Sequence, residues 1–402
     1  MLQYRGLQLR GRGSRPSFVP DVLVEEGKHS ILPLPPSPDV GFRHLIILGI
    51  RGVPAAHGGF ETFAERLALY LRDHGWRVTV YCQGSASGRR ETDTWEGIRR
   101  VHIPVKQNGS VGTIEFDVKC VADVERLPGT ILTLGYNTGF LSMWLRMRGR
   151  INFINMDGLE WKRAKYSFTQ RSYLWINERL AAWSGTKLIA DHPTIAGHLA
   201  TRTSYKRICT IPYGGDPVTE ADPALLAPLR LQSDKFLTLI ARPEPENSVL
   251  EIVRAFSRQQ RGIKLALLGN YDSANPYHAA VLKAAGPDVR FTGAIYDKAI
   301  LRSLRFHSLG YLHGHRVGGT NPSLVEALGA GNAVIAHDNP FNRWVAGNAG
   351  LYFSDEQGCA EQIARLSEDP SLRDRLRQAA RTRWNEEFTW PAVLQQYLEL
   401  ME

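Results

Sequence analysis

Cysteines and long hydrophobic runs are scarce in this chain of 402 residues. The four cysteines, at positions 82, 120, 209 and 359, lie far apart without CxxC spacing. This argues against a zinc site or a disulfide framework and fits a reducing cytosol. The longest apolar runs, such as residues 45–48, have only the length of a strand, so we predict no transmembrane helix.

Signatures of several enzyme and binding classes are also missing. There is no P-loop, no cysteine nucleophile, no readable Ser-His-Asp arrangement and no nucleic-acid-binding module. His313 and His315 flank a predicted strand end, but no third ligand follows at metal spacing. We therefore expect no metal site and no nucleic-acid partner.

The net charge of +9 is carried without a lysine-rich tract. A positive balance suits nucleic acid, a membrane surface or an anionic substrate. Local clusters are formed by Arg146, Arg148 and Arg150 and by Lys162, Arg163 and Lys165. Their interpretation stays open between a solvated face and a patch that meets acidic lipid headgroups.

The first 43 residues differ from the rest of the chain. Four arginines precede the first acid, the segment ILPLPPSPD holds four prolines, and no apolar signal core is present. We predict that residues 1–43 form a disordered leader, or lie upstream of the true start, and we give them no catalytic role.

From position 44 onward, short apolar segments alternate with helical or glycine-rich ones. In residues 44–218 the predicted strands are HLIILGI, WRVTVYC, TILTLGY, INFINMD and KLIAD, and residues 60–74 have the apolar spacing of a helix. In residues 235–388 the predicted strands are KFLTLIAR, IKLALLGN, VRFTGA, LGYLHGH and NAVIAHD. Such alternation predicts parallel sheets covered by helices on both faces.

The predicted fold class is therefore α/β, with two doubly wound, Rossmann-like domains at residues 44–218 and 235–388. Residues 219–234, rich in Ala, Pro and Asp at their start, are interpreted as the linker, and residues 389–402 as a final short helix. Because such sheets bind ligands at the carboxyl ends of their strands, we expect the functional residues around a crevice between the domains.

The loop HGHRVGGTNPSLVE (313–326) joins a predicted strand to a helix that Pro322 can open and that Thr320 or Asn321 can cap. A helix start of this kind offers unpaired N–H groups and a positive dipole end to a phosphate. Glu326 would lie about one turn inside, where its carboxylate can accept hydrogen bonds from sugar hydroxyls. The alternative is an ordinary strand–loop–helix turn.

The loop after the first strand, GIRGVPAAHGGFETFAERL, does not have the glycine spacing of a dinucleotide fingerprint. It nevertheless places Gly58 and Gly59 at a helix start with Arg51 nearby, and together these residues are suited to hold an anionic group. In the second half, Arg242 ends the first strand and can reach a diphosphate bidentately. The alternative for Arg242 is a surface arginine at a strand end.

The segment INMDGLEWKRAKY places an acid at another strand end. Asp157 ends the strand, and Glu160, Trp161 and Arg163 follow closely. A carboxylate beside an aromatic platform is typical of sugar-binding sites, because hydroxyls and apolar ring faces need both. The alternative is a capping Asp beside a core Trp.

These strings resemble the retaining glycosyltransferases of family 4, which have the GT-B fold. GIRGVPAAHGGFETFAERL and MDGLEWKRAKY are similar to the rhamnosyltransferase-type N-terminal domain of bacterial polysaccharide enzymes. HGHRVGGTNPSLVEALGAGN resembles the donor-binding segment of the family. The resemblance extends from residue 44 to the C-terminus and implies two Rossmann-like domains facing across a cleft, with the terminal helix returning to the first domain.

The resemblance implies a donor site built from both domains. Arg242 would bind the donor diphosphate, and Glu326 matches the second glutamate of the family's EX7E pattern, which binds the ribose. The donor-binding residues would be Gly58, Gly59, Arg242, His315, Gly319, Thr320, Asn321, Pro322, Ser323 and Glu326. Two positions depart from the pattern: the first glutamate is replaced by Gly318, and the usual lysine by Asn247.

We expect Arg316 or Arg51 to supply the cation that Asn247 lacks. On the acceptor side, we expect Arg51, Asp157, Trp161 and Arg163. The residues taken as catalytic are Asp157, Glu160, Arg242 and Glu326, with Asp157 and Glu160 orienting the acceptor hydroxyl.

The implied reaction transfers a hexose with retention, most simply L-rhamnose from dTDP-L-rhamnose. The acceptor would be a polyprenyl-diphosphate-linked glycan at the inner face of the plasma membrane, for exopolysaccharide, capsule or O-antigen synthesis. The resemblance implies no cofactor beyond the nucleotide-sugar and no metal. Alternatives are a glucosyl-, galactosyl- or N-acetylglucosaminyltransferase that uses a UDP- or GDP-sugar, a sugar-nucleotide epimerase, and a silent carbohydrate-binding protein.

Overall fold

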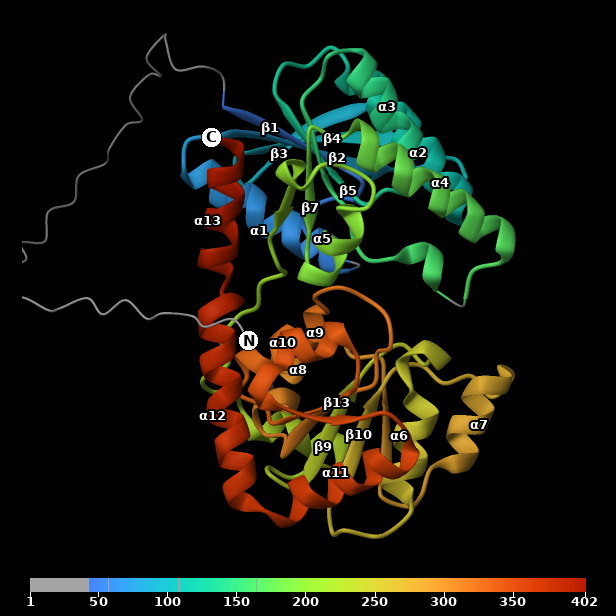
Figure 1. The fold of residues 1–402 in the computed structure, drawn as a ribbon, viewed down its shortest axis with the longest axis vertical. Coiled ribbons are helices and arrows are strands. Elements are labelled where there is room, and N and C mark those ends of the chain that lie inside the picture. The colour runs from blue at the N-terminus through green and yellow to red at the C-terminus, as the bar shows by residue number, and fades with distance from the viewer. Residues whose placement is uncertain (1–42, 57, 108, 164) are drawn as a thin grey trace, which may run out of the picture. The chain divides into compact units, whose positions relative to one another are not determined.

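The computed structural model describes residues 43–402 except residues 57, 108 and 164, so nearly all of the predicted leader lies outside the described residues. The described chain holds two sheets of parallel strands with helices packed on them (Figure 1). Within it, no helix is long and apolar enough to cross a membrane.

The first sheet has eight strands in the order β3-β4-β2-β1-β5-β6-β7-β8. Their bounds are β1 His44–Leu48, β2 Arg77–Gly84, β3 Glu91–Trp95, β4 Ile98–Pro104, β5 Thr130–Leu134, β6 Asn152–Asn155, β7 Lys187–Ala190 and β8 Ile208–Thr210. β1 lies at the centre between β2 and β5, and every side chain of β1 is buried. This burial explains why β1 shows as a continuous apolar run in the sequence.

The β3–β4 hairpin at the edge of this sheet corrects the expectation of purely parallel pairing. β3 runs antiparallel to β4, and the two-residue turn consists of Glu96 (φ 48°) and Gly97 (φ 77°). Positive φ at both central residues is the requirement of a type I′ hairpin turn. β3 has no buried residue, so no hydrophobic pattern announces it in the sequence.

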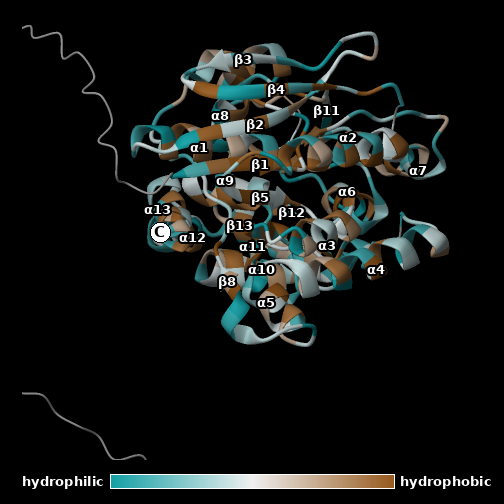
Figure 2. Cartoon of the chain, turned by 90° about the horizontal axis from the view of Figure 1, so that it is seen from above, coloured by the Kyte–Doolittle hydropathy of each residue, from teal (hydrophilic) through white to brown (hydrophobic). Residues whose placement is uncertain are grey.

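Alternate residues of the central strands face different helices. Leu45 and Ile47 pack against α1 (Gly59–Asp73) and the terminal helix α13 (Trp390–Met401). Ile46 and Leu48 pack against α2 (Gly109–Val124) and α3 (Gly139–Met147). Next to them, α4 (Phe168–Ser184) and α5 (Pro193–Leu199) cover β6 and β7. Hydrophobic and hydrophilic residues alternate along these helices, as Figure 2 shows.

The second sheet has the order β11-β10-β9-β12-β13-β14 and is parallel throughout. Its strands are β9 Phe236–Ile240, β10 Lys264–Leu268, β11 Val289–Gly293, β12 Gly310–His313, β13 Val334–His337 and β14 Gly350–Phe353. β14 was not predicted. The helices of this half are α6 Val249–Ser257, α7 Pro276–Ala284, α8 Lys298–Phe306, α9 Pro322–Gly329, α10 Pro340–Ala346, α11 Glu356–Glu368 and α12 Pro370–Glu387.

Residues 219–234, interpreted from the sequence as a linker, contain a 3-10 helix, Pro223–Leu229, whose Leu226 is buried. At the other end of this half, α12 is followed by α13, which joins the core of the first sheet (Figure 1).

In both sheets the strand order reverses beside the first strand, between β1 and β5 and between β9 and β12. Ligands of open α/β sheets bind where the order reverses, outside the carboxyl ends of the strands.

Candidate functional site

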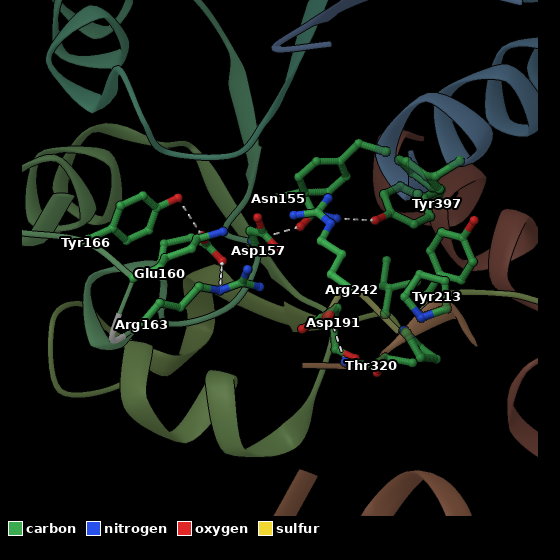
Figure 3. A pocket seen from close by; sticks show the side chains of 17 residues that line it. Asn155, Asp157, Glu160, Arg163, Tyr166, Asp191, Tyr213, Arg242, Thr320 and Tyr397 are labelled. Atoms are coloured by element: carbon green, nitrogen blue, oxygen red, sulfur yellow. Dashed lines mark hydrogen bonds and ion pairs between the residues drawn. The ribbon is translucent and has the colours of Figure 1, made fainter. Parts of the chain in front are cut away.

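Two adjoining cavities, of about 410 Å³ and about 230 Å³, lie where loops from both sheets meet. Their walls combine strand-end residues from both halves of the chain, and the larger one is drawn in Figure 3. The residues that line both cavities are Asp157, Arg163, Asp191, Arg242, Thr320 and Pro322. Glu160 lines only the larger cavity, so that the wall of this cavity contains three acids and two arginines.

Asp157 follows β6 and has a left-handed backbone, with φ 50°. Its N–H donates to Oδ1 of Asn155 at 3.1 Å, and Nδ2 of Asn155 donates to the hydroxyl of Tyr397 at 3.1 Å. A non-glycine residue with positive φ costs free energy, and outside turns and helix caps such residues cluster at functional sites. The strand end, braced by a residue of α13, therefore holds the Asp157 carboxyl at the cavity wall.

Glu160 lies on the next turn of chain and pairs with Arg163, with 2.8 Å between Oε1 and Nε. Nη1 of Arg163 lies 3.7 Å from Oε1 of Glu246, a residue of the loop that follows β9. The backbone N–H of Glu160 donates to the hydroxyl of Tyr136 at 2.8 Å, which fixes this turn. Arg163 thus spans from the first half to the second and borders both cavities.

The carboxyls at this wall are difficult to ionise. Burial, together with the neighbouring charge of Asp157, raises the pKa of Glu160 to about 7. Burial also raises the pKa of Asp157, against the opposing attraction of Arg163. Because the pKa of Glu160 is about 7, its carboxyl is partly protonated at neutral pH and can either donate a hydrogen bond to a bound hydroxyl or accept one from it.

Asp191 directly follows β7 and connects the two halves. The N–H of Thr320 donates to Oδ2 of Asp191 at 2.8 Å, and the hydroxyl of Thr320 donates to the backbone carbonyl of Asp191. Oδ1 is buried without a partner among the described residues. Burial, reinforced by the charge of Asp157, raises the pKa of Asp191 to about 7.

The start of α9 forms the floor opposite these acids. Asn321 caps the helix by accepting from the N–H of Ser323 at 3.0 Å, and Pro322 is the first helical residue, as the sequence predicts. Gly319 lies against Asp191 so closely that a Cβ there would be 2.1 Å from Oδ1. Only glycine allows this approach of the loop to the carboxylate. Ser323 instead turns to the hydroxyl of Tyr311 at 2.6 Å.

Arg242 follows β9, and its side chain extends into the larger cavity in Figure 3. Its guanidinium forms no ion pair with any residue that the structure describes, so it is free for an anionic ligand. Nδ2 of Asn247 donates to the backbone carbonyl of Arg242 at 2.9 Å. The residue that replaces the expected lysine therefore anchors the loop of Arg242 instead of adding charge.

His315 lines the smaller cavity and stacks on His313, with ring centroids 4.3 Å apart. Burial, with the positive charges of Arg163 and Arg242, lowers its pKa to about 4. A neutral imidazole beside these arginines adds no further positive charge at physiological pH.

The first half contributes the start of α1. Gly59 lines the larger cavity with Phe60 and Phe63, whereas Gly58 is the residue that caps the helix and lines neither cavity. The first N–H groups of a helix lack intrahelical partners, so this end also suits an anion.

Five of the predicted site residues line neither cavity, namely Gly58, Ser323, Arg51, Trp161 and Glu326. Arg51 is exposed. Trp161 donates from Nε1 to the buried carboxylate of Glu178, which ties its ring to α4 rather than to the cavity. Glu326 pairs with the buried guanidinium of Arg305. Trp161 lies in the 3-10 helix Glu160–Lys162, and its side chain turns toward α4. The pattern of polar residues at strand ends does not predict this direction.

Several cavity residues were not predicted as site residues, namely Asn155, Lys165, Tyr166, Asp191, Tyr213 and Tyr397. A signal for Asp191 was present, because it ends the predicted strand KLIAD as Asp157 ends INFINMD. The aromatic residues gave no such signal, since their positions depend on how the loops and α13 pack.

Two family models match most of the chain. Residues 42–216 match a domain of unknown function, DUF1972, and residues 248–399 match a family described as glycosyl transferase-like. No curated protein matches the sequence.

Solved structures match over nearly the whole described chain. Sucrose-phosphate synthase from Thermosynechococcus elongatus is 18% identical, with a TM-score of 0.77 over 89% of this chain and 98% of that chain. WaaG, a glycosyltransferase involved in lipopolysaccharide biosynthesis, is 16% identical, with a TM-score of 0.70 over 89% and 99%. Anabaena Alr3699/HepE in complex with UDP is 15% identical, with a TM-score of 0.68 over 89% and 99%.

These similarities confirm the predicted fold class: the two sheets form a GT-B fold. The chain is a glycosyltransferase, and its first half carries a DUF1972 domain. The family descriptions name neither a donor nor an acceptor.

Proposed function

We propose that this glycosyltransferase transfers a hexosyl group to a lipid-linked oligosaccharide at the inner membrane face, with retention of the anomeric configuration. The donor that we propose is dTDP-L-rhamnose. The observation that carries the proposal is the meeting of the start of α9, three acids and Arg242, which has no ion pair with any described residue, around one cavity. Cationic groups and helix amides suit a diphosphate, and acids suit sugar hydroxyls. The choice of rhamnose rests on the sequence resemblance of the first half.

In the proposed mechanism the departing diphosphate develops negative charge, which Arg242 and the positive dipole end of α9 stabilise. A leaving phosphate oxygen takes the proton of the acceptor hydroxyl as that hydroxyl attacks the sugar, so no protein nucleophile is needed. Asp157 and Glu160 orient this hydroxyl, and enclosure by loops of both halves limits hydrolysis by water.

Arg163 is our candidate for the second cation of the diphosphate site. It borders both cavities together with Arg242. By contrast, Arg316 and Arg51 line neither cavity. Arg163 is therefore better placed for a diphosphate than the two arginines expected from the sequence.

The test is nucleotide release from a panel of dTDP-, UDP- and GDP-sugars, with and without polyprenyl-diphosphate-linked glucosyl acceptor. Acceptor-dependent release of dTDP from dTDP-L-rhamnose supports the full proposal. Release from a UDP- or GDP-sugar keeps the mechanism and changes the donor. Conversion of donor without acceptor indicates an epimerase and contradicts the proposal.

A further inference from the structure

Helices α3 and α4 expose large hydrophobic side chains on the side away from the sheet. Nine of the fourteen exposed large hydrophobics among the described residues lie between positions 140 and 183. The nine are Phe140, Trp144, Met147, Ile151, Phe168, Tyr173, Trp175, Ile176 and Trp183. An outward helix face is ordinarily polar, so an apolar one marks an interaction surface.

The spacing along α4 separates two faces. Leu174, Ala181 and Ala182 are buried against β6 and β7. Phe168, Trp175 and Trp183 lie seven or eight positions apart, which places them on one stripe of the opposite face. α3 packs beside α4, since the backbone of Gly139 touches the carbonyl of Asn177, so the exposed faces of the two helices adjoin.

Arginines lie over the rings of this face. The guanidinium carbon of Arg146 is 5.2 Å from the ring centroid of Trp183, and that of Arg148 is 5.2 Å from the ring of Trp144. Arg179 stacks on Trp175 at 3.2 Å. Aromatic rings beside cations are the composition of protein surfaces that lie in the headgroup layer of a membrane.

Acids offset only part of the positive charge of these arginines. The acidic residue of α4, Glu178, is buried and bound to His198 and Arg202, and its Oε1 also lies 4.0 Å from Nη1 of Arg179. Glu125, at the end of α2, contacts the guanidinium of Arg148 but is itself largely buried. A symmetric dimer through this face would bring arginines against arginines, which like-charge repulsion disfavours.

A side cavity of about 330 Å³ borders this face and shares one wall residue with the site cavity. Tyr173 is exposed on the face and lines the side cavity, and Tyr166 lines both the side cavity and the large site cavity. The other residues of its wall are uncharged and come from the starts of α2 and α4 and from the loop after β5. A substrate held in a membrane would therefore meet the site beside this face.

We propose that the outward face of α3 and α4, defined by Trp144, Phe168, Trp175 and Trp183 with Arg146, Arg148 and Arg179, docks on an anionic lipid bilayer. The proposal rests on the proposed function for its lipid-linked acceptor. The basic clusters of the sequence divide in this arrangement: Arg146 and Arg148 belong to the docking face, whereas Arg163 and Lys165 line the cavity.

The test is co-sedimentation of the full chain with vesicles of phosphatidylcholine alone or of equal parts phosphatidylcholine and phosphatidylglycerol. We expect the wild type to bind the anionic vesicles about tenfold or more tightly than the neutral ones, and to lose much of this preference in high salt. Phe168→Gln should weaken binding about tenfold. Tyr296→Gln is the matched control, because both side chains are 84% exposed, and it should leave binding unchanged.

The triple variant Trp144→Gln, Phe168→Gln, Trp183→Gln should abolish sedimentation while it keeps the circular dichroism spectrum and the calorimetric affinity for dTDP and UDP in solution. Equal sedimentation of triple variant and wild type overturns the proposal. So does a wild-type dimer in light scattering that the triple variant dissociates, without vesicle binding. Vesicle binding without turnover of any donor would contradict the proposed function and leave the docking surface standing.

Discussion

The carboxyl edges of the two sheets share a strand-order reversal but differ in chemistry. At the edge of the first sheet stand three acids with raised pKa values, Asp157, Glu160 and Asp191. At the edge of the second sheet lie the N-terminal end of α9 and Arg242, which has no ion pair with any described residue. The same topology therefore offers hydrogen-bonding acids on one side and an anion site on the other.

This difference teaches that the backbone topology provides the location of the site, and that the residues at the strand ends provide its chemistry. The two edges are also in contact, because Thr320 of the second half donates to Asp191 of the first. Since their chemistry differs, changes at the second edge should mainly affect nucleotide binding, and changes at the first edge should mainly affect acceptor chemistry. The following experiments separate these two effects.

The strongest test of the second edge is Arg242→Ala. Loss of the free guanidinium should lower the affinity for dTDP or UDP about 100-fold, or about 3 kcal/mol, since a charge-assisted bond to a diphosphate is lost. Isothermal calorimetry measures this directly. Arg316→Ala is the control and should change affinity less than about twofold, because its side chain is engaged by Glu251 and Ser248. An equal loss in Arg316→Ala would restore Arg316 as the compensating cation.

The first edge should show itself in the pH dependence of stability. Asp191 has a pKa raised from 3.8 to about 7, so the folded state binds more protons than the unfolded state between these values. The free energy of unfolding should therefore fall as the pH rises from about 4 to about 7. At about 1.4 kcal/mol per pKa unit, and with a reduction because the Asp191 carboxyl borders an open cavity, we expect a change of about 3 kcal/mol.

Asp191→Asn removes this titration. Urea unfolding should find the variant similar to the wild type near pH 4 and more stable than it near pH 8. Asp216→Asn is the control, since Asp216 is exposed and paired with Arg66, and it should cost less than about 1 kcal/mol at either pH. A stability difference between Asp191→Asn and wild type that does not vary with pH would contradict the raised pKa.

Acceptor chemistry on the first edge is tested by Asp157→Asn. Asparagine tolerates positive φ as aspartate does, so the fold should be kept. We expect kcat to fall about 100-fold, or about 2.7 kcal/mol, with little change in nucleotide affinity. Trp161→Phe should leave kcat nearly unchanged, because Trp161 lies outside the cavity and its loss of the bond to Glu178 affects stability instead. A large loss of kcat in Trp161→Phe would restore the predicted aromatic platform.

Much of this architecture is predictable from the sequence because buried parallel strands give apolar runs. β1, with all five residues buried, is visible at once, and so is the cap of α9 in Asn321-Pro322. β3 was missed because its side chains face solvent or lie at the margin, and its turn uses Glu96 rather than the more usual Asn or Asp.

The site was predictable where position along the chain determines it. Asp157, Glu160, Arg163, Arg242 and Thr320 follow strand ends and meet at the cavities. Side-chain direction in irregular loops depends on tertiary packing. The sequence therefore did not reveal that Trp161 turns toward α4, or that Tyr397 reaches the cavity from a helix more than 200 residues later.

Glu326 provides the smallest and most discriminating comparison. The family resemblance assigns its carboxylate to the ribose, while the structure pairs it with the buried guanidinium of Arg305. If both contacts form in the complex, Glu326→Gln should weaken UDP and dTDP binding about tenfold, or about 1.4 kcal/mol, and should also lower the free energy of unfolding. If Glu326 serves only to neutralise Arg305, unfolding becomes easier while the calorimetric affinity for both nucleotides stays that of the wild type. Measuring affinity and stability on the same variant therefore decides whether the second half binds the nucleotide through this carboxylate.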